Sequence, residues 1–366
     1  MKVIMSCAGT GGHIYPAIAI ADKIRRMKPE AEILFVGTKQ GMEQKLIVGA
    51  GYDIKGIDAS GFDRKNLLKN FKTVFDIYSG GKQSEEIIRE FKPDLVIGTG
   101  GYVTGIFLRK ASKMGVRCFI HEQNAIPGVA NKMLQNYVEK IFISFEESRN
   151  YFDSKDKLVL SGNPIRKEFL IEDVQDARAK LGLEPSDFML LATGGSLGAA
   201  LLNDAIIDLV KALADAPRGV KLYFVSGKRY YDEVREKLSV VADAKDFVQL
   251  IDYAENMPTL MCAADLVISR AGGSAVSEII ACGKPSVLVP SPNVTNNHQH
   301  HNAKAVADAS AAVMIEEDAI RGDLRIFTSA IMQLILNRER LNLMAQSAKN
   351  IAVFNAVDII YEHIKI

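Results

Sequence analysis

The sequence predicts two α/β domains, each built on a parallel β-sheet. Three observations support this prediction: apolar runs alternate with helical patterns, a strand leading into a glycine-rich loop occurs twice, and 366 residues suffice for two or three domains. The repeated feature spans Val3 to His13 and again Phe188 to Gly198. In each copy, a buried strand turns through glycines into a helix whose free N–H groups and positive dipole end can face an anion.

The candidate strands are short apolar runs bounded by turn residues. In the first half they are Val3–Ser6, Ile33–Val36, Leu95–Gly98, Val116–Ile120, Ile141–Ser144 and Leu158–Leu160. In the second half they are Phe188–Ala192, Leu222–Val225, Val248–Ile251, Leu266–Ser269, Ser286–Val289 and Ala312–Ile315. Turn residues around Pro164 place the domains at 1–164 and 165–344, and we expect a C-terminal helix over about 345–366 to pack back on the first domain.

Charge and cysteine content narrow the class of protein. With 45 basic and 44 acidic residues the net charge is +1, so we expect no nucleic-acid partner. The cysteines are scattered without a Cys-x-x-Cys pair, which indicates a reduced, cytosolic protein. We expect neither a secretory signal nor a transmembrane span, because no apolar stretch approaches about 18 residues.

The first glycine loop holds the strongest candidate for a general base. Its spacing is not that of a dinucleotide site, and Gly37-Thr38-Lys39 stands where such a site carries an acid, which disfavours a nicotinamide enzyme. Glycines here can also serve helix packing alone. His13, however, places an imidazole at the start of the helix, where it can act as a general base near neutral pH.

Further polar segments follow other strands. Gly98–Gly105 is a third glycine-rich loop, and His121–Asn124 ends another strand, where Glu122 is a rival candidate for the base. In Arg270–Glu278 the glycines can present amides to a phosphate, and Glu278 can hold a ribose diol or be a solvated helix acid. The histidines of His298–Asn302 lack supporting carboxylates, so we expect no metal site.

Taken together, the motifs resemble those of the MurG family, bacterial N-acetylglucosaminyltransferases of peptidoglycan biosynthesis that convert lipid I to lipid II. The resemblance covers essentially the whole chain. It is carried, in order, by Gly9–His13, Gly100–Tyr102, His121–Asn124, Gly162–Arg166, Gly194–Gly198, Arg270–Glu278 and His298–Ala303. Two positions depart from the family pattern: Leu197 stands where Gln is frequent and Ala275 where Thr is frequent, which leaves one side-chain contact to the nucleotide in doubt.

The resemblance implies a GT-B fold, two Rossmann-like domains facing a cleft, with the acceptor and membrane on the first domain and UDP-GlcNAc on the second. Thr10, Gly11 and Gly12 would line the cleft and Asn124 would contact the sugar. Arg166 and Ser196 would face the donor diphosphate, and the backbone at Ile251 would meet the uracil. The remaining donor contacts would come from Gly273, Ser274, Ala275, Val276, Ser277, Glu278 and Gln299.

The implied reaction is an inverting transfer of GlcNAc to lipid I. The chain supplies His13 for the acceptor hydroxyl, and Arg166, Ser196 and helix N-termini for the leaving diphosphate. Because no Asp-x-Asp pair is present, we expect no metal and no cofactor. Two alternatives remain: a UDP-GlcNAc 2-epimerase, with Glu122 as a proton-transfer carboxylate, and a non-catalytic nucleotide-sugar sensor.

One segment has the form of a membrane-binding helix. Between Arg64 and Tyr78 the apolar residues fall on one helical face, and the cations precede the first acid, Asp76. We therefore expect peripheral binding to an anionic membrane surface, which the resemblance places at the cytoplasmic face of the bacterial cell membrane. The alternative is an apolar stripe that faces the core.

Overall fold

A computed structural model describes residues 1–60, 69–195, 198–214 and 219–365. For residues 69–72 it describes the backbone alone. The chain divides into two compact units. The first comprises Met1–Arg166 and Asn355–Ile366, and the second comprises Lys167–Phe354. Residues 345–354, which we expected to belong with the first domain, are therefore part of the second unit.

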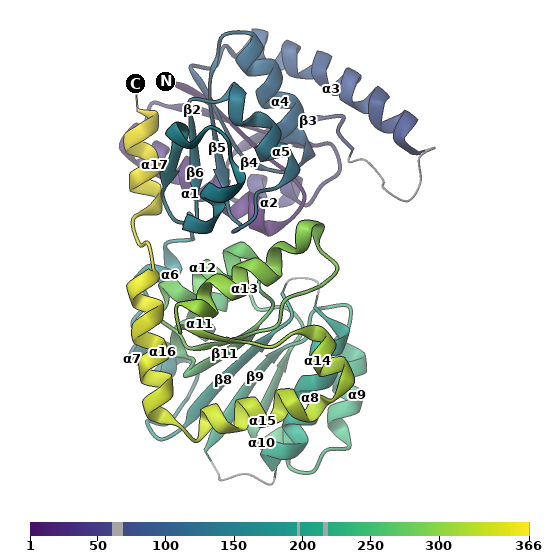
Figure 1. Ribbon diagram of the computed structural model, residues 1–366, viewed down its shortest axis with the longest axis vertical. Helices are drawn as coiled ribbons and strands as arrows, with labels where there is room; N and C mark the ends of the chain where they lie inside the picture. The colour runs from purple at the N-terminus through teal and green to yellow at the C-terminus, as the bar shows by residue number, and fades with distance from the viewer. Residues whose placement is uncertain (61–68, 196–197, 215–218, 366) are drawn as a thin grey trace. The chain divides into compact units, whose positions relative to one another are not determined.

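The first unit contains a seven-stranded sheet in which every pairing is parallel, with the order β3-β2-β1-β4-β5-β6-β7. Figure 1 labels most of the helices and strands of both units. Its strands are β1 (Lys2–Cys7), β2 (Glu32–Thr38), β3 (Asp53–Ile57), β4 (Leu95–Gly100), β5 (Arg117–Glu122), β6 (Lys140–Ile143) and β7 (Leu158–Leu160). Its helices are α1 (Gly11–Met27), α2 (Glu43–Gly49), α3 (Lys69–Phe91), α4 (Tyr102–Lys113), α5 (Val129–Leu134) and α17 (Ala356–Ile364), with 3-10 turns at Gln135–Tyr137, Glu146–Tyr151 and Lys155–Lys157.

Both faces of this sheet are covered, because successive side chains of a strand point to opposite faces. Val3 and Met5 of β1 pack with α1 and α17, whereas Ile4 packs with α4 on the other side. Helix α17 returns to the first unit and buries Ile360 in this core. An ion pair between Lys23 and Asp358 also joins α1 to α17.

The second unit repeats the plan with a six-stranded parallel sheet of order β10-β9-β8-β11-β12-β13. Its strands are β8 (Phe188–Thr193), β9 (Val220–Val225), β10 (Val248–Ile251), β11 (Leu266–Ser269), β12 (Ser286–Leu288) and β13 (Ala312–Met314). Its helices are α6 (Glu168–Ile171), α7 (Val174–Lys180), α8 (Ala200–Ala214), α9 (Tyr231–Ser239), α10 (Ala244–Phe247), α11 (Met257–Ala263), α12 (Gly273–Ala281), α13 (His298–Asp308), α14 (Glu317–Gly322), α15 (Leu324–Ile335) and α16 (Arg338–Ile351), with a 3-10 turn at Thr295–Asn297.

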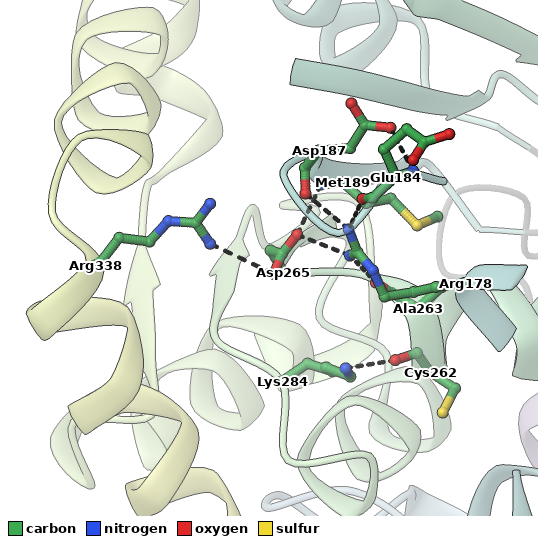
Figure 2. A network of polar contacts seen from close by, with 9 residues as sticks. All are labelled: Arg178, Glu184, Asp187, Met189, Cys262, Ala263, Asp265, Lys284 and Arg338. Carbon is green, nitrogen blue, oxygen red and sulfur yellow. Dashed lines mark hydrogen bonds and ion pairs between the residues drawn. The ribbon is translucent and has the colours of Figure 1, made fainter. Parts of the chain in front are cut away.

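A polar cluster stabilises the amino end of this second sheet, the edge opposite the glycine loops (Figure 2). Oδ2 of Asp265 accepts hydrogen bonds from Met189 N at 2.8 Å and from Arg178 Nη1 at 3.2 Å. Oδ1 of the same carboxylate pairs with Arg338 at 3.6 Å. The cluster ties α7 and α16 to the starts of β8 and β11, so its role is structural.

The structure confirms the predicted fold class and the parallel sheets, and differs in one strand. β3 was not predicted, because its sequence Asp-Ile-Lys-Gly-Ile contains polar residues and a glycine that weaken the strand pattern. It lies at the edge of the sheet, where only one neighbour, β2, constrains it. No helix in the described part of the chain is long and apolar enough to cross a membrane.

Candidate active site

In the first unit, three loops leave the carboxyl ends of the adjacent strands β1, β4 and β5. Open parallel sheets bind ligands at this edge. The β1–α1 loop brings Thr10, Gly11, Gly12 and His13 there. Thr10 is the residue before α1, and its carbonyl accepts the backbone N–H of His13 at 3.0 Å. The first turn of α1 carries no acid, so the N-terminus of the helix is electrostatically open to an anion.

Glycines of the β4–α4 loop allow that loop to approach the β1–α1 loop closely. Gly100 has φ +123°, and a Cβ atom there would lie 2.4 Å from Nδ1 of His13. Gly101 has φ +91°, and its Cβ would lie 2.6 Å from the carbonyl oxygen of Ala8. Both positions combine a backbone conformation that favours glycine with no room for a side chain. The glycine motif therefore serves the placement of His13.

The His13 imidazole is held from behind through Nδ1. This atom lies 3.0 Å from Thr99 O and 3.2 Å from Gln123 Oε1. Gln123, at the end of β5, also contacts Nδ1 of His121 at 3.1 Å. His121 is fully buried, and burial lowers its pKa to about 4, so this second imidazole is neutral at physiological pH. Gln123 and Thr99 were not predicted as site residues, although both lie within motifs that the sequence pointed to.

Glu122, the rival base, is fully engaged in structural hydrogen bonds. Its Oε1 accepts the backbone and side-chain N–H groups of Asn124, both at 3.0 Å. Its Oε2 accepts Gly128 N at 2.9 Å and Asn131 Nδ2 at 2.8 Å. The side chain is only 1% exposed. A carboxylate with four donors inside the protein is suited to orient Asn124 and the start of α5, and is poorly suited to take a proton from a substrate.

Two other predicted site residues belong to the first unit: Asn124, which follows β5, and Arg166, which follows β7. Asn124 is half-buried, with its amide oriented by Glu122. Arg166 is half-buried, and its guanidinium lies 4.9 Å from the ring centroid of Tyr15 on α1. This cation–π contact anchors the arginine to the helix that begins at the β1–α1 loop.

A buried carboxylate missed by the sequence reasoning supports the β1–α1 loop. Glu43, at the start of α2, is inaccessible to solvent. It accepts hydrogen bonds from Thr38 N at 2.9 Å, from Thr38 Oγ1 at 2.5 Å and from Gly9 N at 3.4 Å. The only signal in the sequence is a lone acid preceded by glycines, at Gly37 and Gly41, whose added Cβ atoms would clash with it.

In the second unit, the β11–α12 loop is the best-defined candidate for donor binding. Gly272 precedes α12, and a Cβ atom there would meet nothing within 4 Å. Asn302 Nδ2 holds the loop by donating to Ala271 O at 3.0 Å. Ser274, Ala275 and Glu278 are partly exposed, but Val276 and Ser277 are buried, so Val276 can offer only its backbone to a ligand.

Arg270, at the start of this loop, is committed to the protein itself. Its Nη2 lies 2.6 Å from Oε2 of the buried Glu317, and its Nη1 donates to Val289 O at 3.2 Å and Pro290 O at 3.3 Å. Arg270 therefore fixes the loop between β11, β12 and α14.

The remaining predicted positions of the second unit have different outcomes. The carbonyl of Ile251, at the end of β10, accepts Ser226 N at 3.0 Å, which makes it a member of the fold's own hydrogen bonding. Oε1 of Gln299 accepts Ser291 N at 2.9 Å and so orders the segment after β12. Gly273, the first residue of α12, is buried. Ser196 and Leu197 lie outside the described residues.

The histidine run on α13 does not form a metal centre among the described residues, where no group of three or more His, Cys, Asp or Glu side chains could hold an ion. His300 instead pairs with Glu316 at 2.6 Å, and its ring meets that of His301 edge-on.

Comparisons with known proteins identify the family. The glycosyltransferase family 28 N-terminal domain matches residues 3–143, and the family 28 C-terminal domain matches residues 189–360. A relative from Acetivibrio thermocellus, named UDP-N-acetylglucosamine–N-acetylmuramyl-(pentapeptide) pyrophosphoryl-undecaprenol N-acetylglucosamine transferase, is 42% identical over 365 residues, covering 100% of this chain and 98% of the relative.

Solved structures agree with this family at the level of the fold. The crystal structure of MurG from Acinetobacter baumannii superposes with a TM-score of 0.78 at 27% identity and covers 99% of each chain. A UDP-GlcNAc 2-epimerase from Neisseria meningitidis, solved with UDP-GlcNAc, has a TM-score of 0.68 at 17% identity, covering 99% of each chain, a likeness of fold alone. The chain belongs to glycosyltransferase family 28 and, within it, to the MurG N-acetylglucosaminyltransferases.

Proposed function

We propose that this protein transfers GlcNAc from UDP-GlcNAc to the 4-hydroxyl of the MurNAc residue of lipid I, giving lipid II for peptidoglycan synthesis. The names of its relatives across the full chain support this reaction and this pair of substrates. The observation that carries the chemistry is the His13 imidazole, anchored through Nδ1 at the ligand-binding edge of the first sheet.

The proposed mechanism is a single displacement. Nε2 of His13 takes the proton of the acceptor hydroxyl while the oxygen forms a bond to C1 of GlcNAc. The bond between C1 and the UDP oxygen breaks with inversion, and UDP leaves with that electron pair. The base belongs to the first unit, and we assign the donor to the second, where Gly272, the residue before α12, is unobstructed and the first turn of the helix carries no acid.

We assign the leaving diphosphate to fixed dipoles and cations. Arg166, Ser196 and the N-terminal amides of α12 are the proposed partners, and Glu278 is the proposed partner of the ribose. The proposal includes no metal step. Chelator treatment should leave turnover unchanged, and a loss of activity that magnesium restores would contradict this part.

The experiment that tests the function measures UDP release from UDP-GlcNAc with and without a short-chain lipid I analogue, with the disaccharide product followed by mass. Acceptor-dependent release with matching lipid II formation is the expected result. Acceptor-independent release with free N-acetylmannosamine would establish the epimerase instead. Binding of UDP-GlcNAc without any product would establish the sensor.

We also propose that α3 binds the membrane that carries the acceptor. Val74, Phe75 and Tyr78 of this helix are 58%, 68% and 63% exposed, which argues against the alternative that their stripe faces the core. Lys82 lies one turn further, with its Nζ 4.7 Å from the Tyr78 ring. Apolar and cationic side chains together suit an anionic lipid surface. Arg64, Lys65, Leu67 and Leu68 of the predicted segment lie outside the described residues.

Membrane binding is tested by vesicle co-sedimentation of a Phe75→Ser/Tyr78→Ser variant. We expect weaker binding to phosphatidylglycerol vesicles with UDP-GlcNAc affinity intact, because exposed side chains contribute little to stability. The matched control replaces Val240 and Leu336, exposed residues of the second unit, with serine. Equal binding of both variants would contradict the proposed role of α3.

A further inference from the structure

A series of hydrogen bonds runs behind the proposed base and ends just after β7. It begins at His13 Nδ1, passes through the amide of Gln123 and the ring of His121, and ends at the carbonyl of Gly162. The links measure 3.2, 3.1 and 3.0 Å. Gln123 and His121 are buried, so bulk water does not compete for the two bonds of the His121 ring.

Two backbone carbonyls determine the position of each proton in this series of hydrogen bonds, because a carbonyl oxygen can only accept a hydrogen bond. Thr99 O lies 2.7 Å from the Gln123 amide nitrogen, which fixes the orientation of that amide. Its oxygen therefore faces His13 Nδ1, and Nδ1 must carry a proton. Thr99 O also lies 3.0 Å from Nδ1 and requires the same proton.

The other end of this series imposes the same direction. Gly162 O accepts from Nε2 of His121, so that nitrogen carries the proton of a neutral ring. Nδ1 of His121 is then unprotonated and accepts the second N–H of the Gln123 amide. Burial keeps His121 in this neutral form, because it lowers the pKa of the ring to about 4.

We propose that Gln123, oriented by Thr99 and His121, is a positioning residue that holds His13 in its Nδ1–H tautomer and so leaves the lone pair on Nε2. Among the residues that the structure describes, both hydrogen bonds of the His13 ring use Nδ1, which leaves Nε2 for a substrate proton. The significance for catalysis rests on the proposed function, whereas the tautomer does not depend on it.

The same arrangement serves the charged state of the base. When Nε2 takes a proton from the acceptor hydroxyl, Nδ1–H stays in place and still donates to Gln123 Oε1 and Thr99 O. Hydrogen bonds from a charged donor are stronger than those from a neutral one, so both acceptors stabilise the imidazolium as it forms. No atom behind the ring has to reorient during the step.

The tautomer is measured directly by long-range 1H–15N NMR of the protein labelled at its six histidines, at a pH of about 8, with His13→Ala identifying the His13 signals. We expect His13 to show a protonated Nδ1 and an unprotonated Nε2, without any substrate present. A protonated Nε2 in the wild-type protein would overturn the proposal. This outcome is separate from the assay of function, since a correct tautomer without transferase activity would refute only the function.

Three variants test the role of Gln123. Gln123→Leu removes one acceptor of the imidazolium and should increase the share of the Nε2–H tautomer and lower kcat about tenfold, with the KM for UDP-GlcNAc unchanged. Gln123→Glu keeps an oxygen toward His13 and should retain the Nδ1–H form of His13, but its second oxygen faces the acceptors Thr99 O and His121 Nδ1, so we expect a loss of stability. The matched control is Gln135→Leu, which removes another buried glutamine of this unit, bonded to Asp153, and should change neither readout. An unchanged His13 spectrum and kcat in Gln123→Leu would overturn the proposal.

Discussion

The β1–α1 loop of the first unit and the β11–α12 loop of the second use the same backbone plan for different purposes. Each passes from a buried parallel strand through glycines into a helix without an acid in its first turn. In the first loop, Thr99 and Gln123 from neighbouring strands hold one side chain, His13, by hydrogen bonds. In the second, the charged side chain Arg270 is paired within the protein, and Gly272 stays unobstructed.

The difference teaches which part of each loop can act chemically. The first loop presents an imidazole in a defined tautomer, so its function should depend on a side chain. The second presents backbone amides at a helix N-terminus, so its function should depend on the support that keeps the backbone in place. Substitutions in the two loops should therefore have different signatures, in turnover for the first and in stability and donor affinity for the second.

The largest effect is expected for His13→Ala. Loss of a general base should lower kcat by about 10²- to 10⁴-fold, while UDP-GlcNAc affinity, measured by calorimetry, stays within twofold. The control is His363→Ala, which removes an exposed histidine of the same unit and should leave kcat unchanged. Retention of most activity in His13→Ala would transfer the role of base to another group.

The second loop should respond through stability. In Arg270→Met the buried Glu317 loses its closest partner, and we expect the second unit to lose about 3–5 kcal/mol of unfolding free energy, measured by urea titration, together with donor affinity. Arg321→Met is the matched control, because that arginine pairs with the same carboxylate while 62% exposed. If both variants lower the unfolding free energy equally, the buried ion pair between Arg270 and Glu317 does not support the loop.

Acid should weaken the first unit through His121. An unfolded histidine titrates near pH 6.5, whereas burial lowers the pKa of His121 to about 4 in the fold. Between these values the unfolded chain binds a proton that the folded chain does not, so stability falls as the pH drops from about 6.5 to about 4, by up to about 3 kcal/mol. Urea titrations across this range should show a shallower slope for His121→Asn than for the wild type. Equal slopes of unfolding free energy against pH in the two proteins would show that His121 is not the group that weakens the first unit in acid.

The smallest effect should separate a glycine that packs against the first loop, Gly100, from a glycine of the second loop, Gly272. Gly100→Ala places a Cβ against the His13 ring and should cost about 1–3 kcal/mol and lower kcat, whereas Gly272→Ala should be nearly neutral in stability. Gly115→Ala isolates the backbone contribution, since Gly115 has φ +81° but an added Cβ would meet nothing within 4 Å. Thermal denaturation and turnover of the three variants provide the test. Equal turnover in Gly100→Ala and Gly115→Ala would exclude a steric role for Gly100.

The sequence was sufficient to predict the features that depend on residues close together in the chain. Buried strands such as β1 and β8 are continuous apolar runs, and glycines mark the loops that follow them. The supports of the site were beyond sequence reasoning, because Glu43 and Gln123 act on residues 34 and 110 positions away in the chain. Nothing in the local pattern distinguishes them from a solvated acid or a strand-end amide. Glu122 shows the converse, since its type suggested chemistry and its contacts revealed a structural role.

The return of α17 to the first unit has a consequence for the order in which the protein is made. The core around β1 includes Ile360 and Ile364, which follow the whole of the second unit in the sequence. The second unit is a continuous stretch, Lys167–Phe354, so all of its residues have been synthesised before that core can close. Domains usually complete folding from the N-terminus during synthesis. Here the first unit cannot be completed until the second has been synthesised, and a nascent chain that stops short of residue 355 leaves the core around β1 without α17.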